Sequence, residues 1–292
     1  MLWRLKVLAK ILLSRVPLGY TVFRRIGIFR HGAMDSAGYA LKVFQTHFGR
    51  ARERGLTAPF VALEIGPGDS VASAILARSV GASATWLVDV GNFATDDMRL
   101  YVRTVETARA AGLAVPEDVN LANLSSLLAS CHARYLSTGL RNFAEIPTGS
   151  VGFVWSQAVL EHVRAAEMER LISEMYRVLR PGGIASHRID LGDHLGGSLN
   201  NLRFSDALWE SRLMAESGFY TNRLRFGQML DLFRQAGFTV EVLGTDLWPQ
   251  VPLPRSVLAD RFRSLPDEEL RVRGFDVILH RSPEFRRGAA AV

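Results

Sequence analysis

From residue 59 onward, short apolar stretches alternate with segments that carry apolar residues at helical spacing. Seven stretches predict strands: PFVALEI (59–65), ATWLVDV (84–90), ARYLST (133–138), SVGFVWS (150–156), GIASHRIDL (183–191), TVEVLGTDL (239–247) and RVRGFDVILH (271–280). Helical patterns occur at 36–54, 70–80, 95–112, 120–131 and 164–180. Strands separated by helices of this length usually form a parallel sheet through right-handed crossovers. The pattern therefore predicts an α/β, doubly wound fold in which the last two strands can form an antiparallel pair at one edge.

The amino-terminal residues follow a different pattern. MLWRLKVLAKILLSRVPLGY predicts a helix that Pro17 ends, with most basic residues on one half and most leucines on the other. This helix is too short and too often interrupted by charge to span a bilayer, and it lacks the features of a secretory signal. We expect residues 1–55 to form a basic amphipathic helical extension. It could pack on the protein's own core, lie on an anionic membrane surface or bind a partner.

Composition narrows the class of protein. The 292 residues are 48% hydrophobic, and a chain of this length can bury a core without disulfide or metal cross-links. The net charge is +6, but residues 1–34 hold seven basic residues and no acid, which leaves 28 basic and 29 acidic residues elsewhere. A nucleic-acid enzyme more often carries its positive charge across the folded domain, so we expect no nucleic-acid partner. The single cysteine, Cys131, excludes a disulfide framework and fits the cytoplasm.

Two strand ends carry residues suited to a nucleoside. The first predicted strand ends in Glu64 and is followed by a turn with Gly66 and Gly68, where the backbone can approach a ligand closely. A dinucleotide motif would need a third glycine at position 71, which is valine. Glu64 would repel a pyrophosphate but suits an ammonium or sulfonium group. Asp89 ends the second strand, where an acid accepts hydrogen bonds from both ribose hydroxyls. The two ends together predict an adenosine site beside a cation.

Four motifs in order resemble the class I S-adenosylmethionine-dependent methyltransferases, and most closely their small-molecule group, over roughly residues 58–195. They are E-x-G-x-G, the acid after strand two, S-x-x-V-L-E-H-V after strand four and R-V-L-R-P-G-G before strand five. The resemblance implies a Rossmann-like seven-stranded sheet in the order 3-2-1-4-5-7-6 with the last strand antiparallel. It also implies a methyltransferase domain over residues 56–292 and S-adenosylmethionine as the cofactor.

The same resemblance assigns cofactor contacts. Glu64, Gly66 and Gly68 would surround the methionine moiety, and Asp89 would hold the ribose. The stretch from Leu140 to Asn142 would lie beside the adenine. Ser156 and Gln157 would border the methionine end and open toward the substrate.

Residue types exclude several subclasses. Enzymes that methylate base amino groups usually carry D/N-P-P-[FYW] after strand four, where this chain reads SQAV. A ribose-methylating tetrad needs two lysines, but Lys6, Lys10 and Lys42 all precede the sheet region. Metal-dependent relatives carry an E-x-x-E-H run, of which only Glu161 and His162 are present. We therefore expect no metal.

The acceptor side is predicted less closely. Residues 192–230 form a long insertion whose aromatic and polar residues suit a lid over an acceptor, or a helical hairpin that extends the core. His194 is our first candidate for the general base because an ordinary imidazole titrates near neutral pH. His162 and Asp190 are further catalytic candidates.

These features favour transfer to a small-molecule or lipid-linked acceptor, above all O-methylation of a sugar hydroxyl. Residues 1–30 would bring the enzyme to the inner membrane face, where such acceptors lie. The alternatives are a quinone or other C- or N-methyltransferase, and a non-catalytic nucleoside-binding protein that acts at a membrane.

Overall fold

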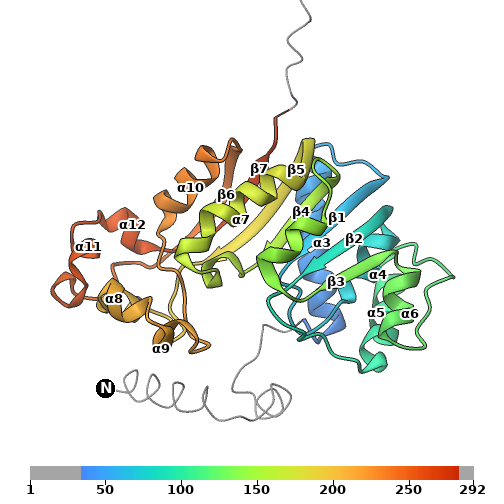
Figure 1. Cartoon of the computed structure of the whole chain (residues 1–292), viewed down its shortest axis with the longest axis horizontal. Coiled ribbons are helices and arrows are strands. Elements are labelled where there is room, and N and C mark those ends of the chain that lie inside the picture. Colours follow the sequence, from blue (N-terminus) through green and yellow to red (C-terminus); the bar gives the residue numbers. More distant parts are fainter. Residues whose placement is uncertain (1–33, 283–292) are drawn as a thin grey trace, which may run out of the picture.

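A computed structural model describes residues 34–282, which are built around one seven-stranded sheet in the order β3-β2-β1-β4-β5-β7-β6 (Figure 1). The strands are β1 (Phe60–Ile65), β2 (Ala82–Val88), β3 (Ala133–Leu136), β4 (Val151–Gln157), β5 (Leu179–Asp190), β6 (Thr239–Leu247) and β7 (Val272–His280). The predicted fold class and strand order are confirmed. The predicted amphipathic helix and its membrane contact fall on residues 1–30, outside the described residues.

Strand direction brings the expected site residues to one edge of the sheet. β1 runs parallel to β2 and β4, β2 to β3 and β4 to β5, whereas β7 is antiparallel to both β5 and β6. Glu64 pairs with Leu87 on one side and with Trp155 on the other. The carboxyl ends of the three central strands are therefore level with one another, as ligand binding in this fold requires.

Helices cover both faces of the sheet. One face carries α3 (Ala37–Glu53), α4 (Ala72–Ser79), α5 (Met98–Ala110) and α6 (Leu124–Ser130), and the other carries α7 (Ala165–Val178) and α10 (Phe226–Gln235). Side chains of β4 alternate between the two cores: Phe153 and Trp155 pack in the first, and Val154 packs in the second. Helix α3, from the predicted extension, packs on β4 and β5 and on the neighbouring helices.

The remaining helices are short. They are η1 (Gly139–Glu145), η2 (Leu160–His162), η3 (Asn200–Arg203), α8 (Asp206–Trp209), α9 (Arg212–Ala215), η4 (Arg255–Val257), α11 (Asp260–Arg263) and α12 (Asp267–Arg271). Residues after β5 form two small clusters of their own, one around Trp209 and one around Phe262. This part of the chain extends the structure beyond the sheet at one end (Figure 1).

Strand β5 begins earlier than predicted. Leu179 already pairs with Val151, and the register then shifts so that Ile184 pairs with Phe153. The R-P-G-G turn, with Gly182 at φ 74°, therefore lies within the strand as an irregularity and does not precede it.

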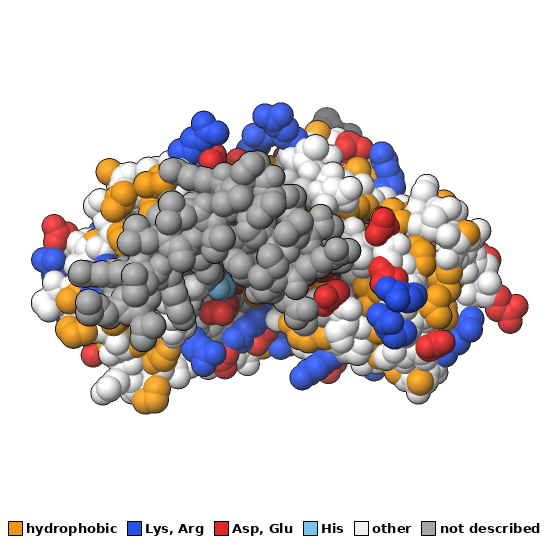
Figure 2. All heavy atoms as spheres, turned by 90° about the horizontal axis from the view of Figure 1, so that it is seen from below, with side chains coloured by type: hydrophobic (Ala, Val, Ile, Leu, Met, Phe, Trp, Pro, Cys, Tyr) orange, Lys and Arg blue, Asp and Glu red, His pale blue; other side chains and the backbone are white. Residues whose placement is uncertain are grey.

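The described surface carries charges of both signs. Figure 2 shows basic and acidic side chains interspersed over the described part of the face seen from below. Between residues 34 and 282, no helix is long and apolar enough to cross a bilayer.

Candidate functional site

The glycine turn and Asp89 meet at the carboxyl edge of β1 and β2. Gly66 and Gly68 adopt φ values of 72° and 65°, which favour glycine. The Gly68 N–H donates to Asp89 Oδ2 at 2.9 Å, and the Val90 N–H donates to Asp89 Oδ1 at 2.7 Å. Two backbone donors thus fix the orientation of a carboxylate that is 8% exposed. This acceptor-only group sits where the sequence predicts a ribose.

An apolar side chain stands beside this carboxylate. Val90 is 79% exposed, although the residues before it are buried. The Gly139 N–H donates to the Asp89 carbonyl at 2.7 Å, and a Cβ on Gly139 would lie 3.3 Å from Val90 Cγ1. Val90 and the turn after β3 therefore offer an apolar surface for a flat ring. We did not single out Val90 from the sequence, where it looks like the last residue of a strand.

Gly66 serves packing as well as the turn. A Cβ at this position would lie 2.6 Å from Val159 Cγ2, so Val159 from the loop after β4 fills the space that the missing side chain leaves. Because Gly66 has no side chain, the chain after β1 packs directly against the loop after β4.

Glu64 is turned inward. It is 2% exposed, and its carboxylate accepts a hydrogen bond from Ser73 in the first turn of α4. Burial raises the pKa of Glu64 to about 7, although the Ser73 hydrogen bond acts in the opposite direction. Near neutral pH the group is therefore partly protonated and braces β1 against α4.

Leu140 and Asn142 lie in η1, whose first residue, Gly139, donates to the Asp89 carbonyl. Leu140 packs partly buried against the core under α7. The Asn142 Oδ1 accepts from the Thr138 N–H at 2.7 Å, and its Nδ2 donates to Glu145 Oε1 at 3.0 Å. The amide of Asn142 thus holds the shape of the turn that flanks Val90.

Ser156 and Gln157 end β4 and point to opposite faces. Ser156 is fully buried, with its Oγ 2.7 Å from His187 Nδ1 in β5. Gln157 is half-buried, and its Oε1 lies 3.0 Å from Nε2 of His47 in α3. Of the two, only Gln157 stands at the surface of the strand end. His47 is a residue that the sequence analysis missed, since it lies outside every motif.

The catalytic candidates His162 and His194 lie together. Both side chains are exposed, and their rings stack with centroids 4.9 Å apart and an interplanar angle of 20°. His162 Nδ1 lies 3.0 Å from the Tyr220 carbonyl, which can only accept, so Nδ1 carries the proton. Asp190 is the last residue of β5 and precedes His194 closely in the sequence. Its Oδ1 accepts from the Gly192 N–H at 2.8 Å.

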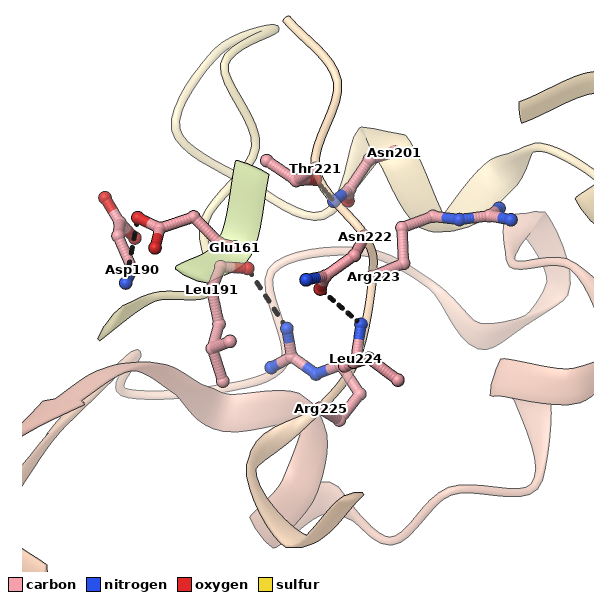
Figure 3. A pocket seen from close by; sticks show the side chains of 9 residues that line it. All are labelled: Glu161, Asp190, Leu191, Asn201, Thr221, Asn222, Arg223, Leu224 and Arg225. Atoms are coloured by element: carbon pink, nitrogen blue, oxygen red, sulfur yellow. Dashed lines mark hydrogen bonds between the residues drawn. The ribbon is translucent and has the colours of Figure 1, made fainter. Parts of the chain in front are cut away.

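A small polar cavity separates these strand ends from the segment after β5. Its volume is about 10 Å³, about the least that can hold one water molecule. Figure 3 shows its lining: Glu161, Asp190, Leu191, Asn201, Thr221, Asn222, Arg223, Leu224 and Arg225. Glu161 is 2% exposed, and burial raises its pKa to about 8. In the sequence, Glu161 stands out only as part of the L-E-H run after β4. Its burial depends on neighbours from residues 190–225, which the sequence does not place beside it.

The aromatic residues of the predicted lid pack on one another. Trp209, Phe219 and Tyr220 are at most 5% exposed and form a cluster with Leu195 and Met214. They stabilise the insertion from within. Among the described residues, 34–282, no group of three or more His, Cys, Asp or Glu side chains could hold a metal ion.

Comparisons with known proteins agree with this geometry. Residues 63–186 match the family described as "Methyltransferase domain". Over 118 residues the chain is 32% identical to a probable S-adenosylmethionine-dependent methyltransferase of Mycolicibacterium smegmatis, which covers 39% of this chain and 40% of that protein. The matched part is thus less than half the length of this curated relative.

Two solved structures resemble part of this chain. One is phosphoethanolamine N-methyltransferase 2 of Haemonchus contortus, with 15% identity and a TM-score of 0.47 over 82% of this chain and 53% of that chain. The other is an S-adenosylmethionine-dependent methyltransferase of Methanosarcina mazei, with 18% identity and a TM-score of 0.48 over 80% of this chain and 97% of that chain.

The glycine turn, Asp89 and the S-x-x-V-L-E-H-V sequence all lie within the matched residues, and the strand order agrees with the expectation. Residues 63–186 therefore match a methyltransferase domain, and their motifs and the strand order are those of the class I S-adenosylmethionine-dependent methyltransferases, whose cofactor is S-adenosylmethionine.

Proposed function

We propose that the protein transfers the methyl group of S-adenosylmethionine to a hydroxyl of a small-molecule or lipid-linked acceptor, above all a sugar hydroxyl. The observation that carries this proposal is the exposed pair of imidazoles, His162 and His194, beyond the ends of β4 and β5. A hydroxyl is a weak nucleophile that needs a base to take its proton as it attacks. Two imidazoles at this edge suit O-methylation.

The residues present fit the cofactor. Asp89, oriented by the Gly68 and Val90 N–H groups, would accept from the ribose hydroxyls. The exposed Val90 would face the adenine. The methionine half would lie toward Gln157 and the glycine turn. When bound, the cofactor supplies an electrophilic methyl group on a sulfonium.

His162 is the better oriented base. Because its Nδ1–H donates to the Tyr220 carbonyl, Nε2 is the basic nitrogen of the neutral ring. Nε2 would take the acceptor O–H proton while the O–CH₃ bond forms and the S–CH₃ bond breaks, which leaves a neutral thioether. His194, stacked on this ring, is the second candidate, and Asp190 would add negative charge that favours the imidazolium.

Residues 192–230 would cover the acceptor. The Tyr220 carbonyl links this segment to the base, so closure of the segment and orientation of His162 would occur together. Residues 1–30 would bring the enzyme to the cytoplasmic face of a membrane, where lipid-linked sugars are exposed.

Calorimetric titration tests the cofactor. The full chain should bind S-adenosylhomocysteine and S-adenosylmethionine but not NAD, and Asp89→Ala should lose this binding while keeping its circular dichroism spectrum. Binding that survives Asp89→Ala would refute the ribose assignment.

An acceptor screen tests the reaction. Transfer of labelled methyl from S-adenosylmethionine to nucleotide sugars or lipid-linked sugars, lost in His162→Asn, would support the proposal. Transfer to a quinone or an amine would replace the sugar acceptor, and cofactor binding without transfer to any acceptor would favour a non-catalytic role.

Vesicle sedimentation tests the membrane contact. The full chain should bind vesicles with anionic lipid and should lose this binding when residues 1–20 are deleted, with cofactor affinity retained. Equal binding by both chains would refute the membrane contact.

A further inference from the structure

His47 connects helix α3 to the ends of two strands. The ring is fully buried, with Nδ1 2.7 Å from Ser186 Oγ in β5 and Nε2 3.0 Å from Gln157 Oε1 in β4. His47 lies before the matched methyltransferase residues, 63–186. A residue outside the matched domain thus contacts a side chain at the end of its central strand.

The directions of these hydrogen bonds follow from their atoms. An amide oxygen only accepts, so Nε2 of His47 carries the proton and donates to Gln157. Nδ1 of a neutral ring then accepts from the Ser186 hydroxyl. Burial lowers the pKa of His47 to about 4, so the ring is neutral near pH 7. The amide of Gln157 is therefore held with its oxygen toward His47 and its NH₂ group on the other side.

Gln157 occupies a constrained position beside the glycine turn. Trp155 pairs with Glu64 across the parallel strands β4 and β1. Gln157 and Gly66 each lie two residues further along the chain, so they are level with each other. The next residue, Ala158, has a φ of 53°, and its N–H donates to the Arg188 carbonyl at 2.9 Å. Left-handed backbone at a non-glycine residue is uncommon and concentrates at functional sites.

We propose that His47 is a positioning residue that holds the Gln157 amide so that its N–H groups donate to the carboxylate of the methionine half of the cofactor. This inference rests on the proposed function, which places the methionine half near Gln157. A carboxylate only accepts hydrogen bonds, so the outward NH₂ group is complementary to it, whereas an outward amide oxygen would repel it. Within residues 34–282 the Gln157 amide nitrogen has no hydrogen-bond partner of its own.

Two ligands separate this contact from the rest of the site. S-adenosylhomocysteine carries the carboxylate, and 5′-methylthioadenosine keeps the nucleoside and sulfur but lacks the amino-acid half. For Gln157→Ala, calorimetry should show S-adenosylhomocysteine binding weakened by about ten- to a hundredfold, as for loss of a hydrogen bond to a charged group. Binding of 5′-methylthioadenosine should stay within about twofold of the unaltered chain.

Two amide variants test His47 itself. His47→Gln places an amide near the Nε2 position and keeps a donor to Gln157, whereas His47→Asn reaches only the Nδ1 position and keeps the contact with Ser186. His47→Asn should reproduce the ligand-selective loss of Gln157→Ala, and His47→Gln should stay within about threefold of the unaltered chain for both ligands. Thermal unfolding of both variants controls for stability.

The outcomes distinguish this inference from the proposed function. If the unaltered chain binds neither ligand, the cofactor assignment itself fails. If it binds both, and His47→Asn and His47→Gln have equal affinities for S-adenosylhomocysteine, His47 does not position Gln157. Should neither His47 variant fold, Gln157→Ala decides: an equal loss for both ligands overturns the inference.

Discussion

Glu161 offers a sharp test of how the strand ends pack against residues 221–225. Its Oε1 accepts from the Asp190 N–H at 3.2 Å, and its Oε2 has no hydrogen-bond partner among residues 34–282. Burial raises the pKa of this carboxyl to about 8, and the charge of Asp190 acts in the same direction. The folded protein therefore holds a proton that the unfolded chain releases at lower pH.

The magnitude follows from linkage. In the unfolded chain the carboxyl titrates near its ordinary pKa of 4.5, and in the folded protein near 8. Between these values the unfolded chain binds fewer protons, so the free energy of unfolding falls as pH rises and levels off above the folded pKa. The contribution of Glu161 to this fall is about 5 kcal/mol. Glu161→Gln copies the protonated carboxyl and removes this loss.

Urea unfolding of the full chain measures the effect. The unaltered protein and Glu161→Gln should be about equally stable near pH 4.5, and the variant should be several kcal/mol more stable near pH 9. Glu169→Gln, at an exposed position on α7, is the matched control and should show a difference that does not depend on pH. A stability difference for Glu161→Gln that is the same at both pH values would refute the reasoning.

Three further changes test the packing by unfolding measurements. Gly66→Ala should lower the free energy of unfolding by about 2 kcal/mol, because its Cβ would lie 2.6 Å from Val159 Cγ2 at a φ of 72°. Adding Val159→Ala should recover part of this loss, and no recovery would contradict the contact. Arg225→Met should cost about 3 kcal/mol or more, because the buried guanidinium donates to the carbonyls of Leu191, Glu269 and Val272; a neutral result would refute that role. Burial lowers the pKa of His187 to about 3, so stability should fall as pH drops below 6.5, and His187→Phe should make this fall shallower by up to about 1.4 kcal/mol per pH unit. An unchanged slope would contradict the burial of a neutral ring.

The sheet could be predicted because its strands are short, apolar and bounded by turns. Hydrophobic pattern located all seven strands, and the motif resemblance supplied their order. The start of β5 could not be predicted, because Pro181 and Gly182 indicate a turn wherever they occur. Only pairing of Leu179 with Val151 extends the strand across them.

The cofactor side of the site was more predictable than the acceptor side. Asp89 and Gly68 follow adjacent parallel strands, so their contact at 2.9 Å follows from topology. The orientation of Ser156 could have been predicted by alternation, since Trp155 faces the α3 side and its neighbour must face the other. The contacts of His47 could not be predicted from the sequence, because its partners lie 110 and 139 residues away and no motif connects them.

Contacts made by the segment after β5 explain why the acceptor is harder to predict. The Asn222 N–H donates to the Glu161 carbonyl at 2.7 Å, and its Nδ2 donates to the Leu160 carbonyl at 2.8 Å. The Tyr220 carbonyl accepts from His162 on the same short turn. Movement of residues 220–222 away from η2 would therefore break these hydrogen bonds and release the imidazole. Under the proposed function, acceptor choice and the orientation of His162 therefore depend on the same residues, 220–222, which lie outside the matched residues 63–186.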